Sequence, residues 1–290
     1  MKIALIGTSP IIVLIAHRLS KNNEVTIFDY SKEFGGAWSW ENFNKISVPN
    51  KTNVIVPANS QEEKKIKEIN KFFLNNFSLK SKKIKNNYHT LHSYKPKNVY
   101  EYDLYNMYKI IFAEKRIKII KKKVSKLEKK NKKLLVNNMY KFDKIFIPFF
   151  AGLNTLIYRN KVEKFDYNII DSKHLFLISK NKLFKDFYYS EDFNFFLDRA
   201  QVERKNNLYF FKARIRKEFK KFTKKNLLDL LIPKKKHKKI IKSKIIKYKN
   251  FYRNESQLKK IKKINCKNIK VIDTSQFVFS FFKNRINNEK

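Results

Sequence analysis

The sequence predicts an α/β fold with a parallel sheet, into which a smaller mixed α+β domain is inserted. Its opening reads as a buried strand (3–6), a helix (11–19) and a second strand (24–29). Two strands joined so closely by a crossover helix form a βαβ unit, in which the strands are parallel and adjacent. Strand-like patterns at 117–147 and a final apolar strand and helix at 269–286 supply further elements of this domain.

The chain between these elements is less regular. Residues 60–77 are predicted to form a helix with Ser60 as its N-cap, and Glu63 follows at the spacing of a capping box. Residues 78–98 are polar and basic, and we expect a loop there. Residues 100–114 carry the apolar and aromatic spacing of another helix.

The middle of the chain predicts a separate domain. Strand-like runs alternate with charged turns over residues 165–211, which is typical of a mixed α+β domain. We therefore expect a discontinuous first domain over residues 1–60, 100–155 and 265–290, and an inserted domain over residues 156–264.

The composition is strongly basic. The chain of 290 residues carries 67 Lys and Arg against 25 Asp and Glu, a formal net charge of +42. A compact protein with this charge attracts polyanions. Lysine makes up almost all of the excess, and glycine is scarce, as an AT-rich coding sequence would produce. The charge therefore has a functional and a purely compositional interpretation.

Residues 212–263 are the most basic segment, with 22 Lys or Arg and three acids. Leucines within 227–233 and isoleucines within 240–246 have amphipathic helical spacing, which predicts helices rather than a disordered tail. Interleaved Phe and Tyr would suit nucleic-acid binding through phosphates and bases. An anionic membrane surface is a second possible partner, and a solvated face without a partner is the third interpretation.

The single cysteine limits the chemistry. Cys266 has no second cysteine to pair with, which excludes an intramolecular disulfide and every multi-cysteine zinc pattern. We expect no metal site and a reducing, cytoplasmic location. The apolar stretch 3–16 is too short to span a bilayer and lacks the small-residue cleavage pattern of a signal peptide.

The turn after the first strand has the spacing of a dinucleotide-binding site. Gly7 stands at the first glycine of the G-x-G-x-x-G fingerprint, whereas Ser9 and Ile12 replace the second and third. Pro10 ends the turn before the helix, and a helix N-terminus at this place binds a pyrophosphate. Asp29, 22 residues after Gly7, ends the second strand, where an acidic side chain binds ribose hydroxyls. An ordinary βαβ turn is the alternative.

Residues 2–40, which read KIALIGTSP at the first strand and EVTIFDYSKEFGGAWSW from the second, resemble the start of the FAD-dependent amine-oxidase and UDP-galactopyranose-mutase-like flavoproteins. In that family a Gly-Gly pair follows the acidic residue, as Gly35 and Gly36 follow Asp29. The resemblance implies a Rossmann-like FAD/NAD(P)-binding domain in which this pair passes close to the FAD phosphates and ribityl chain. Buried aromatic packing is the leading interpretation of Trp38 and Trp40 beside this pair, and covering a flavin or a sugar substrate is the alternative that makes Trp38 a candidate cofactor ligand.

Two further segments resemble the same family. Residues 117–152 are similar to its cofactor-domain strands, which implies that the backbone near Val124 lies against the adenine. Residues 271–286 are similar to its last flavin-binding strand and helix. This similarity implies that Asp273 lies near the ribityl chain or the pyrophosphate.

Arginine is rare in this chain, and four of the nine arginines lie between residues 199 and 216. Where lysine is the usual cation, an arginine indicates bidentate recognition of a carboxylate or phosphate. Arg199, Arg214 and Arg216 are therefore candidate ligands of an anionic substrate, with structural ion pairs as the alternative.

Taken together, these features predict a FAD-dependent oxidoreductase-like protein acting on a small, anionic or sugar-nucleotide substrate, with the flavin carrying the chemistry. They identify no catalytic residue. A cofactor-free relative that binds a partner is one alternative, favoured by Ile12 and by the absence of glycine after Gly152. A polyanion-binding protein that acts through residues 212–263 is the other.

Overall fold

The structure is a computed structural model that forms two compact units. The first unit comprises Met1–Ala37, Leu104–Ile170 and Phe251–Lys290, and the second comprises Trp38–Asp103 and Asp171–Asn250. The described residues are 1–31, 34–35, 40–43, 46–49, 54–55, 57, 59–85, 87–89, 98–102, 104–130, 133–148, 155–158, 161–166, 168–184, 187–190, 197–216, 219, 221–252 and 255–272.

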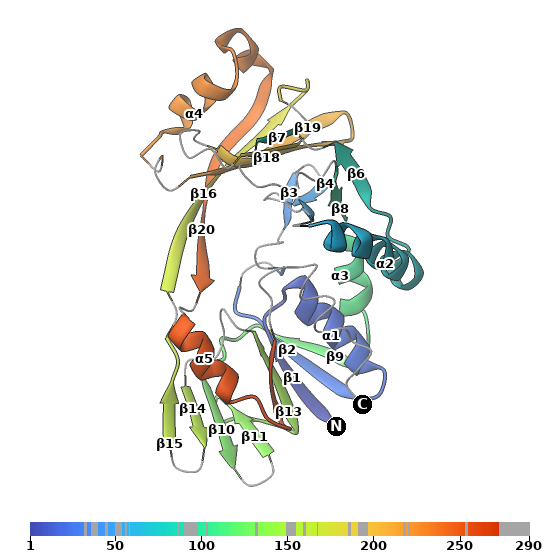
Figure 1. The fold of residues 1–290 in the computed structure, drawn as a ribbon, viewed down its shortest axis with the longest axis vertical. Coiled ribbons are helices and arrows are strands. Elements are labelled where there is room, and N and C mark those ends of the chain that lie inside the picture. Colours follow the sequence, from blue (N-terminus) through green and yellow to red (C-terminus); the bar gives the residue numbers. More distant parts are fainter. Residues whose placement is uncertain are drawn as a thin grey trace. The chain divides into compact units, whose positions relative to one another are not determined.

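A parallel sheet forms the centre of the first unit (Figure 1). Its strands follow the order β21 (Ile269–Ile272), β13 (Lys144–Pro148), β1 (Lys2–Ile6), β2 (Glu24–Phe28) and β9 (Ile117–Ile120). All four neighbouring pairs are parallel, and α1 (Pro10–Ser20) connects β1 to β2. The predicted βαβ unit is therefore confirmed. Numbered along the chain, the order is 3-2-1-4-5, which is consistent with a Rossmann-like fold.

Different layers cover the two faces of this sheet (Figure 1). On one face, α1 packs against the strands and against α3 (Leu104–Phe112). The other face carries a second sheet in the order β12 (Tyr140–Phe142), β11 (Lys133–Val136), β10 (Lys126–Lys130), β14 (Thr155–Tyr158) and β15 (Lys161–Lys164). Ala4 and Ile6 of β1 share a core with this second sheet and with Ile261 of α5 (Glu255–Lys263). Because side chains alternate along a strand, Ile3 and Leu5 face the helices.

The second unit combines two sheets, a hairpin and helices. Its larger sheet has the order β20 (Ile240–Tyr252), β16 (Asn168–Ser179), β19 (Leu208–Ile215), β18 (Leu197–Lys205), β17 (Phe187–Ser190) and β7 (Asn87–His89). The smaller sheet has the order β5 (Val54–Ile55), β8 (Asn98–Glu101) and β6 (Lys82–Lys85), and β3 (Trp40–Phe43) pairs with β4 (Ile46–Pro49). The helices described here are α2 (Ser60–Phe77), α4 (Lys224–Leu231) and the 3₁₀ helix η3 (Lys234–Lys239).

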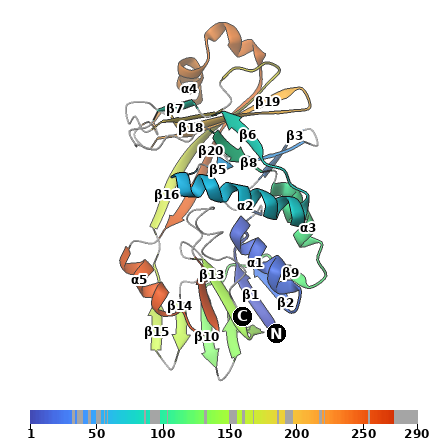
Figure 2. The ribbon, with the colours of Figure 1, turned by 45° about the vertical axis from the view of Figure 1, so that its right-hand side comes forward.

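The long helix α2 lies beside β5 and β8 (Figure 2). Phe73 packs against Tyr102, with 4.8 Å between the ring centroids, and the Tyr102 hydroxyl donates a hydrogen bond to Asn70. The predicted helix is confirmed, but its predicted N-cap is wrong. Asn59 is the N-cap, and its side chain accepts a hydrogen bond from the Glu62 N–H at 2.8 Å, because Ser60 already lies within the helix.

Three further predictions are corrected by strand pairing. The expected loop 78–98 contains β6 and β7, and the expected helix 100–114 begins only at Leu104 because residues 98–101 form β8. The isoleucines within 240–246 lie on a strand rather than a helix. Ile245 packs on one face of the large sheet and Ile246 on the other, which is the two-residue period of a strand. The leucine-rich run at 227–231 does form a helix, α4.

The predicted domain boundaries stay a prediction. The compact units divide the chain differently, since Trp38–Asp103 joins Asp171–Asn250 in the second unit. The pairing of β7 with β17 explains this division, because it ties the earlier stretch into the larger sheet.

Within the described part of the chain, the helices are too short or too polar to cross a lipid bilayer.

Candidate dinucleotide-binding site

The candidate site in the first unit begins at the turn between β1 and α1. Gly7 has a φ of +85°, a conformation that favours glycine, and its N–H donates to the carbonyl oxygen of Phe28 at 2.7 Å. A Cβ atom placed on Gly7 would meet no heavy atom of the described residues within 4 Å. The backbone of the turn therefore faces open space, where a ligand can approach it closely.

The N-terminus of α1 lacks a side-chain cap. Ser9 occupies the N-cap position with extended backbone angles, but its hydroxyl does not cap the helix, and the first turn contains no acidic residue. Pro10 is the first helical residue and is buried. The Ser9 Oγ atom is buried and has no hydrogen-bond partner among the described residues. A helix N-terminus with a spare buried donor suits an anion.

The Asp29 carboxylate connects three segments of the chain. Its side chain is only 4% exposed, and one oxygen accepts hydrogen bonds from the N–H of Ser31, at 2.8 Å, and from the Ser31 hydroxyl. The other oxygen accepts a hydrogen bond from the Thr8 hydroxyl. The Thr8 Oγ1 atom also accepts the N–H of Gly35 at 2.9 Å. Asp29 therefore holds the Gly35 backbone beside the β1–α1 turn.

Tyr108 of α3 stabilises the same turn through a hydrogen bond to its backbone. Its hydroxyl donates to the carbonyl oxygen of Thr8 at 2.6 Å. Burial raises the pKa of Tyr108 well above its ordinary value, and the negative charge of Asp29 raises it further. Tyr108 is therefore a permanent donor at physiological pH.

Two described residues between Asp29 and Gly35, Ser31 and Phe34, make further contacts with the rest of the first unit. The ring of Phe34 makes an edge contact with Phe112, with 4.8 Å between the centroids. The Lys121 Nζ atom lies 3.5 Å from the centroid of the Phe34 ring and donates to the carbonyl oxygen of Ser31 at 2.9 Å. These contacts fix the segment to α3 and to the end of β9.

The structure thus brings Gly7, Ser9, Pro10, Asp29 and Gly35 together in one place. Sequence reasoning missed Thr8 and Tyr108. The register of β1 and β2, which pairs Ile6 with Phe28, is the signal for Thr8, because it places the two strand ends side by side. Nothing in the sequence marks Tyr108, which is separated from Thr8 by 100 positions.

Of the other predicted cofactor ligands, the structure describes only Val124. The Val124 side chain is buried in the core between the two sheets of the first unit, and the expected contact of its backbone with adenine stays a prediction. Gly36, Trp38 and Asp273 lie outside the described residues.

The candidate substrate arginines belong to the second unit. Arg199 on β18 stands opposite Arg214 on β19, and Arg214 also stands opposite His174 on β16. Arg214 is half-buried, and Arg216 follows directly after β19. Their predicted role in anion binding is untested, but the sheet register does place positions 199 and 214 next to each other.

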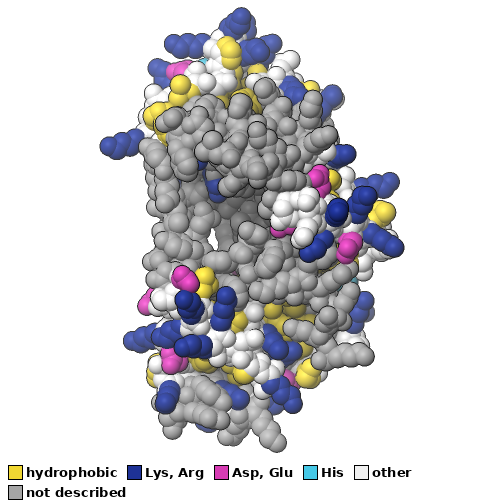
Figure 3. Space-filling model, in the orientation of Figure 1, with side chains coloured by type: hydrophobic (Ala, Val, Ile, Leu, Met, Phe, Trp, Pro, Cys, Tyr) yellow, Lys and Arg dark blue, Asp and Glu magenta, His cyan; other side chains and the backbone are white. Residues whose placement is uncertain are grey.

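The basic segment 212–263 does not form one continuous surface element. It runs through the end of β19, α4, η3, β20 and α5, and it contributes to both units. On the face drawn in Figure 3, the described Lys and Arg side chains are spread over several elements. The first cation of the segment, Lys212, is completely buried.

Lys212 belongs to a buried ionic cluster in the second unit. Its Nζ atom lies 2.9 Å from Glu203 Oε2, and Lys205 Nζ lies 3.0 Å from Glu203 Oε1. Burial raises the pKa of Glu203, but the two lysine charges outweigh burial and hold the pKa below its ordinary value. Nearby, Glu101 Oε1 accepts a hydrogen bond of 2.5 Å from Gln201. Burial raises the pKa of Glu101, and Lys212 offsets this only in part.

Comparison with known proteins identifies structures with a similar fold but no family to which the chain belongs. No family model and no curated protein match the chain. Among solved structures, wild-type putrescine oxidase bound to putrescine is similar with a TM-score of 0.59 and 8% identity, covering 94% of this chain and 93% of that one. A putative protoporphyrinogen oxidase from Exiguobacterium sp. 255-15 has a TM-score of 0.57 and 7% identity, with coverage of 94% and 93%.

A third similar structure is a CLA-producing fatty acid isomerase from P. acnes, with a TM-score of 0.55, 10% identity and 93% coverage of each chain. The similarity spans nearly the whole of each protein. At such low identity, it shows that this chain shares its overall fold with two oxidases and an isomerase.

We expect Thr8→Val to loosen the site, because valine keeps the shape of threonine but loses the hydroxyl that joins Asp29 to Gly35. The free energy of unfolding should fall by about 1–3 kcal/mol, the cost of leaving buried polar groups unpaired. Thr8→Ser keeps the hydroxyl and is the matched control. Urea unfolding of both variants measures the difference, and equal stability of the two would show that the hydroxyl is not needed.

The raised pKa of Glu101 predicts a pH-dependent effect of Glu101→Gln. Because the folded state holds this proton more tightly than the unfolded state, wild-type stability from Glu101 is present below the ordinary pKa of 4.5 and is lost as the pH rises through the folded pKa. Glutamine has no proton to lose. The variant should therefore gain on the wild type as the pH is raised from about 4 to about 7 in urea unfolding. A constant difference would contradict the shift.

Proposed function

We propose that the first unit binds FAD and that the protein is a flavin-dependent oxidoreductase acting on a small anionic substrate. The observation that carries the proposal is the buried Ser9 hydroxyl at the N-terminus of α1, which has no hydrogen-bond partner among the described residues. A buried donor without a partner is costly unless a ligand supplies one. The pyrophosphate of a dinucleotide is an anion that matches this place.

The residues present fit such a cofactor at two further points. Gly7 leaves open space against the backbone of the turn, and Gly35 is held next to that turn through Thr8. The resemblance of residues 2–40 to flavoproteins of the amine-oxidase type supports FAD over a plain nicotinamide dinucleotide. The shared fold with two oxidases supports the same class of reaction.

Within this proposal, each described residue has a binding or positioning role. Ser9 donates its hydroxyl to the pyrophosphate, and the N-terminus of α1 stabilises the negative charge. Asp29 and Tyr108 hold the turn in place, and one remaining lone pair of Asp29 is offered to a ribose hydroxyl. FAD, when bound, supplies the redox chemistry. In the second unit, Arg199, Arg214 and Arg216 are the proposed ligands of the anionic substrate.

A cofactor-free relative is the second candidate, and a specific observation favours it. Asp29, the residue expected to bind ribose, already accepts three hydrogen bonds from Thr8 and Ser31 and is almost fully buried. A protein that had lost its cofactor would retain such a carboxylate for structural reasons alone. The protein would then act through a partner.

The first experiment is to purify the protein, denature it and identify any released chromophore by absorbance and mass spectrometry. Stoichiometric FAD is the expected result. If none is released, the protein is titrated with FAD and flavin fluorescence is followed. Failure to bind under both conditions would overturn the proposal and favour the cofactor-free relative.

Ser9→Ala separates a ligand contact from a structural one. Because the Ser9 hydroxyl has no partner among the described residues, its loss should leave urea unfolding of the FAD-free protein unchanged or slightly improved. FAD affinity should fall by about tenfold, as expected for one hydrogen bond to a charged group. Thr8→Val serves as the contrasting variant, since it should lower both stability and affinity. Unchanged FAD affinity in Ser9→Ala would contradict the assigned contact.

A further inference from the structure

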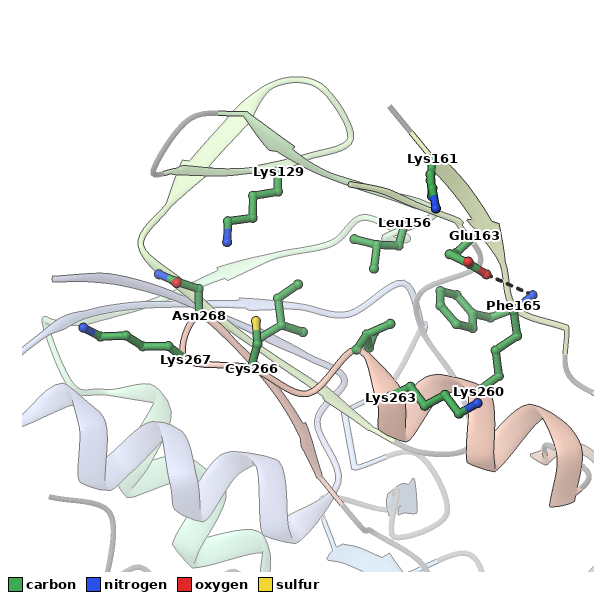
Figure 4. Close-up of a pocket in the computed structure, with 12 residues that line it drawn as sticks. Lys129, Leu156, Lys161, Glu163, Phe165, Lys260, Lys263, Cys266, Lys267 and Asn268 are labelled. Carbon is green, nitrogen blue, oxygen red and sulfur yellow. Dashed lines mark ion pairs between the residues drawn. The ribbon is translucent and has the colours of Figure 1, made fainter. Parts of the chain in front are cut away.

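A cavity of the first unit lies apart from the candidate dinucleotide site. Its volume is about 670 Å³. On one side lie the strands β10, β14 and β15, and on the other lie the helix α5 and the segment that leads from α5 into β21 (Figure 4). The side chains around it come from Lys129, Leu156, Lys161, Glu163, Phe165, Lys260, Lys263, Ile264, Cys266, Lys267, Asn268 and Ile269. Its size suits a small organic ligand.

The cavity and the β1–α1 turn lie at opposite ends of the strands of the parallel sheet. Asn268 and Ile269 stand where β21 begins, whereas the turn with Gly7 stands where β1 ends. Because the strands run parallel, the cavity lies at the amino ends of the strands and the turn lies at their carboxyl ends. The cavity is therefore separate from the site proposed for FAD.

Positive charge dominates the lining of the cavity. Five lysines surround it and Glu163 is the one acidic residue among its lining residues, paired with Lys260 at 3.2 Å. The lysines come from β10, β15, α5 and the segment before β21, so the charges enclose the space from several sides (Figure 4). Lysine binds phosphate groups as a point charge. An enclosing set of lysines therefore suits a ligand with several negative charges.

The inner surface of the cavity is apolar. Leu156, Phe165 and Ile269 are buried members of the core between the two sheets, and Ile264 packs against them. Because those three side chains are almost fully buried, the apolar surface open to a ligand comes from the partly buried Ile264 and from the methylene chains of the lysines. An inorganic anion would leave this part of the cavity unused.

We propose that this cavity binds a small organic polyphosphate, with its phosphates on the lysine ammonium groups and its apolar part on Ile264 and the methylene chains of the lysines. The combination of charge and apolar surface carries the assignment. A binding site here goes beyond the proposed flavin chemistry, because it uses none of the residues of the dinucleotide site.

The single cysteine of the chain provides a direct test. Cys266 is exposed and lines the cavity, so a bound ligand should shield it from alkylation by the neutral reagent N-ethylmaleimide. ATP is the organic probe and tripolyphosphate is the probe with charge alone, both at a constant ionic strength of about 0.15 M. We expect ATP to slow alkylation saturably, by about fivefold or more, and tripolyphosphate to require a higher concentration for the same protection.

Two double variants separate the cavity from general attraction to a basic protein. Lys263→Glu with Lys267→Glu removes two charges from the cavity and should raise the ATP concentration for half-protection by about tenfold or more. Lys115→Glu with Lys118→Glu makes the same change of net charge at exposed positions of the first unit outside the cavity, and should leave that concentration nearly unchanged. Ser9→Ala should also leave it unchanged, because Ser9 belongs to the dinucleotide site.

Four results would overturn the proposal. ATP that gives no protection would mean that the cavity does not bind it. An equal loss in both lysine pairs would assign the effect to net charge. Equal protection by tripolyphosphate and ATP would remove the role of the apolar surface. Loss of protection in Ser9→Ala would assign ATP to the dinucleotide site, so failure of this proposal is distinguishable from failure of the flavin proposal.

Discussion

The hydrogen bonds of the Asp29 carboxylate hold the candidate site together. A buried charge is tolerated only when polar groups surround it, and here Thr8 and Ser31 supply three donors. Through Thr8 the same interaction reaches the N–H of Gly35. These hydrogen bonds join the end of β1, the end of β2 and Gly35 to one another. Gly7 and Ser9 lie in the turn on either side of Thr8, which takes part in this network.

Asp29 has two distinct roles to consider. The sequence predicts that it binds ribose, whereas the structure shows that it joins Thr8 and Ser31. Asp29 stands at the position predicted for the ribose ligand, yet its described partners belong to the protein itself. The proposed anion site at α1 does not depend on whether Asp29 binds ribose, since the proposal rests on the helix end and on the Ser9 hydroxyl, which has no partner among the described residues. The second unit shows the same principle in its own core, where Lys212 is buried only because Glu203 neutralises it.

Local patterns predicted much of the first unit and less of the second. A buried apolar strand, a turn glycine and a crossover helix are encoded by consecutive residues, so the βαβ unit of residues 2–28 was predictable. The isoleucines of β20 were misread because both helical and strand spacing fit a short apolar run. Pairing with β16 decided the outcome by giving both faces of the strand something to pack against. The cap of α2 was missed by one residue for a similar reason, since Asn59 and Ser60 are both good caps.

The sequence by itself determined the opening α/β unit, the place of Gly7 and Ser9 at its turn and the excess of positive charge. These properties depend on neighbouring residues or on composition alone. Only the tertiary structure decided which groups meet: Thr8 with Asp29, and Tyr108 with the carbonyl of Thr8. It also placed Lys129 and Lys267 in the lining of one cavity. Such partners are far apart along the chain, and no local pattern specifies them. Strand register and helix packing bring them together, because burying the apolar faces of the sheets leaves each polar group only the partners nearby.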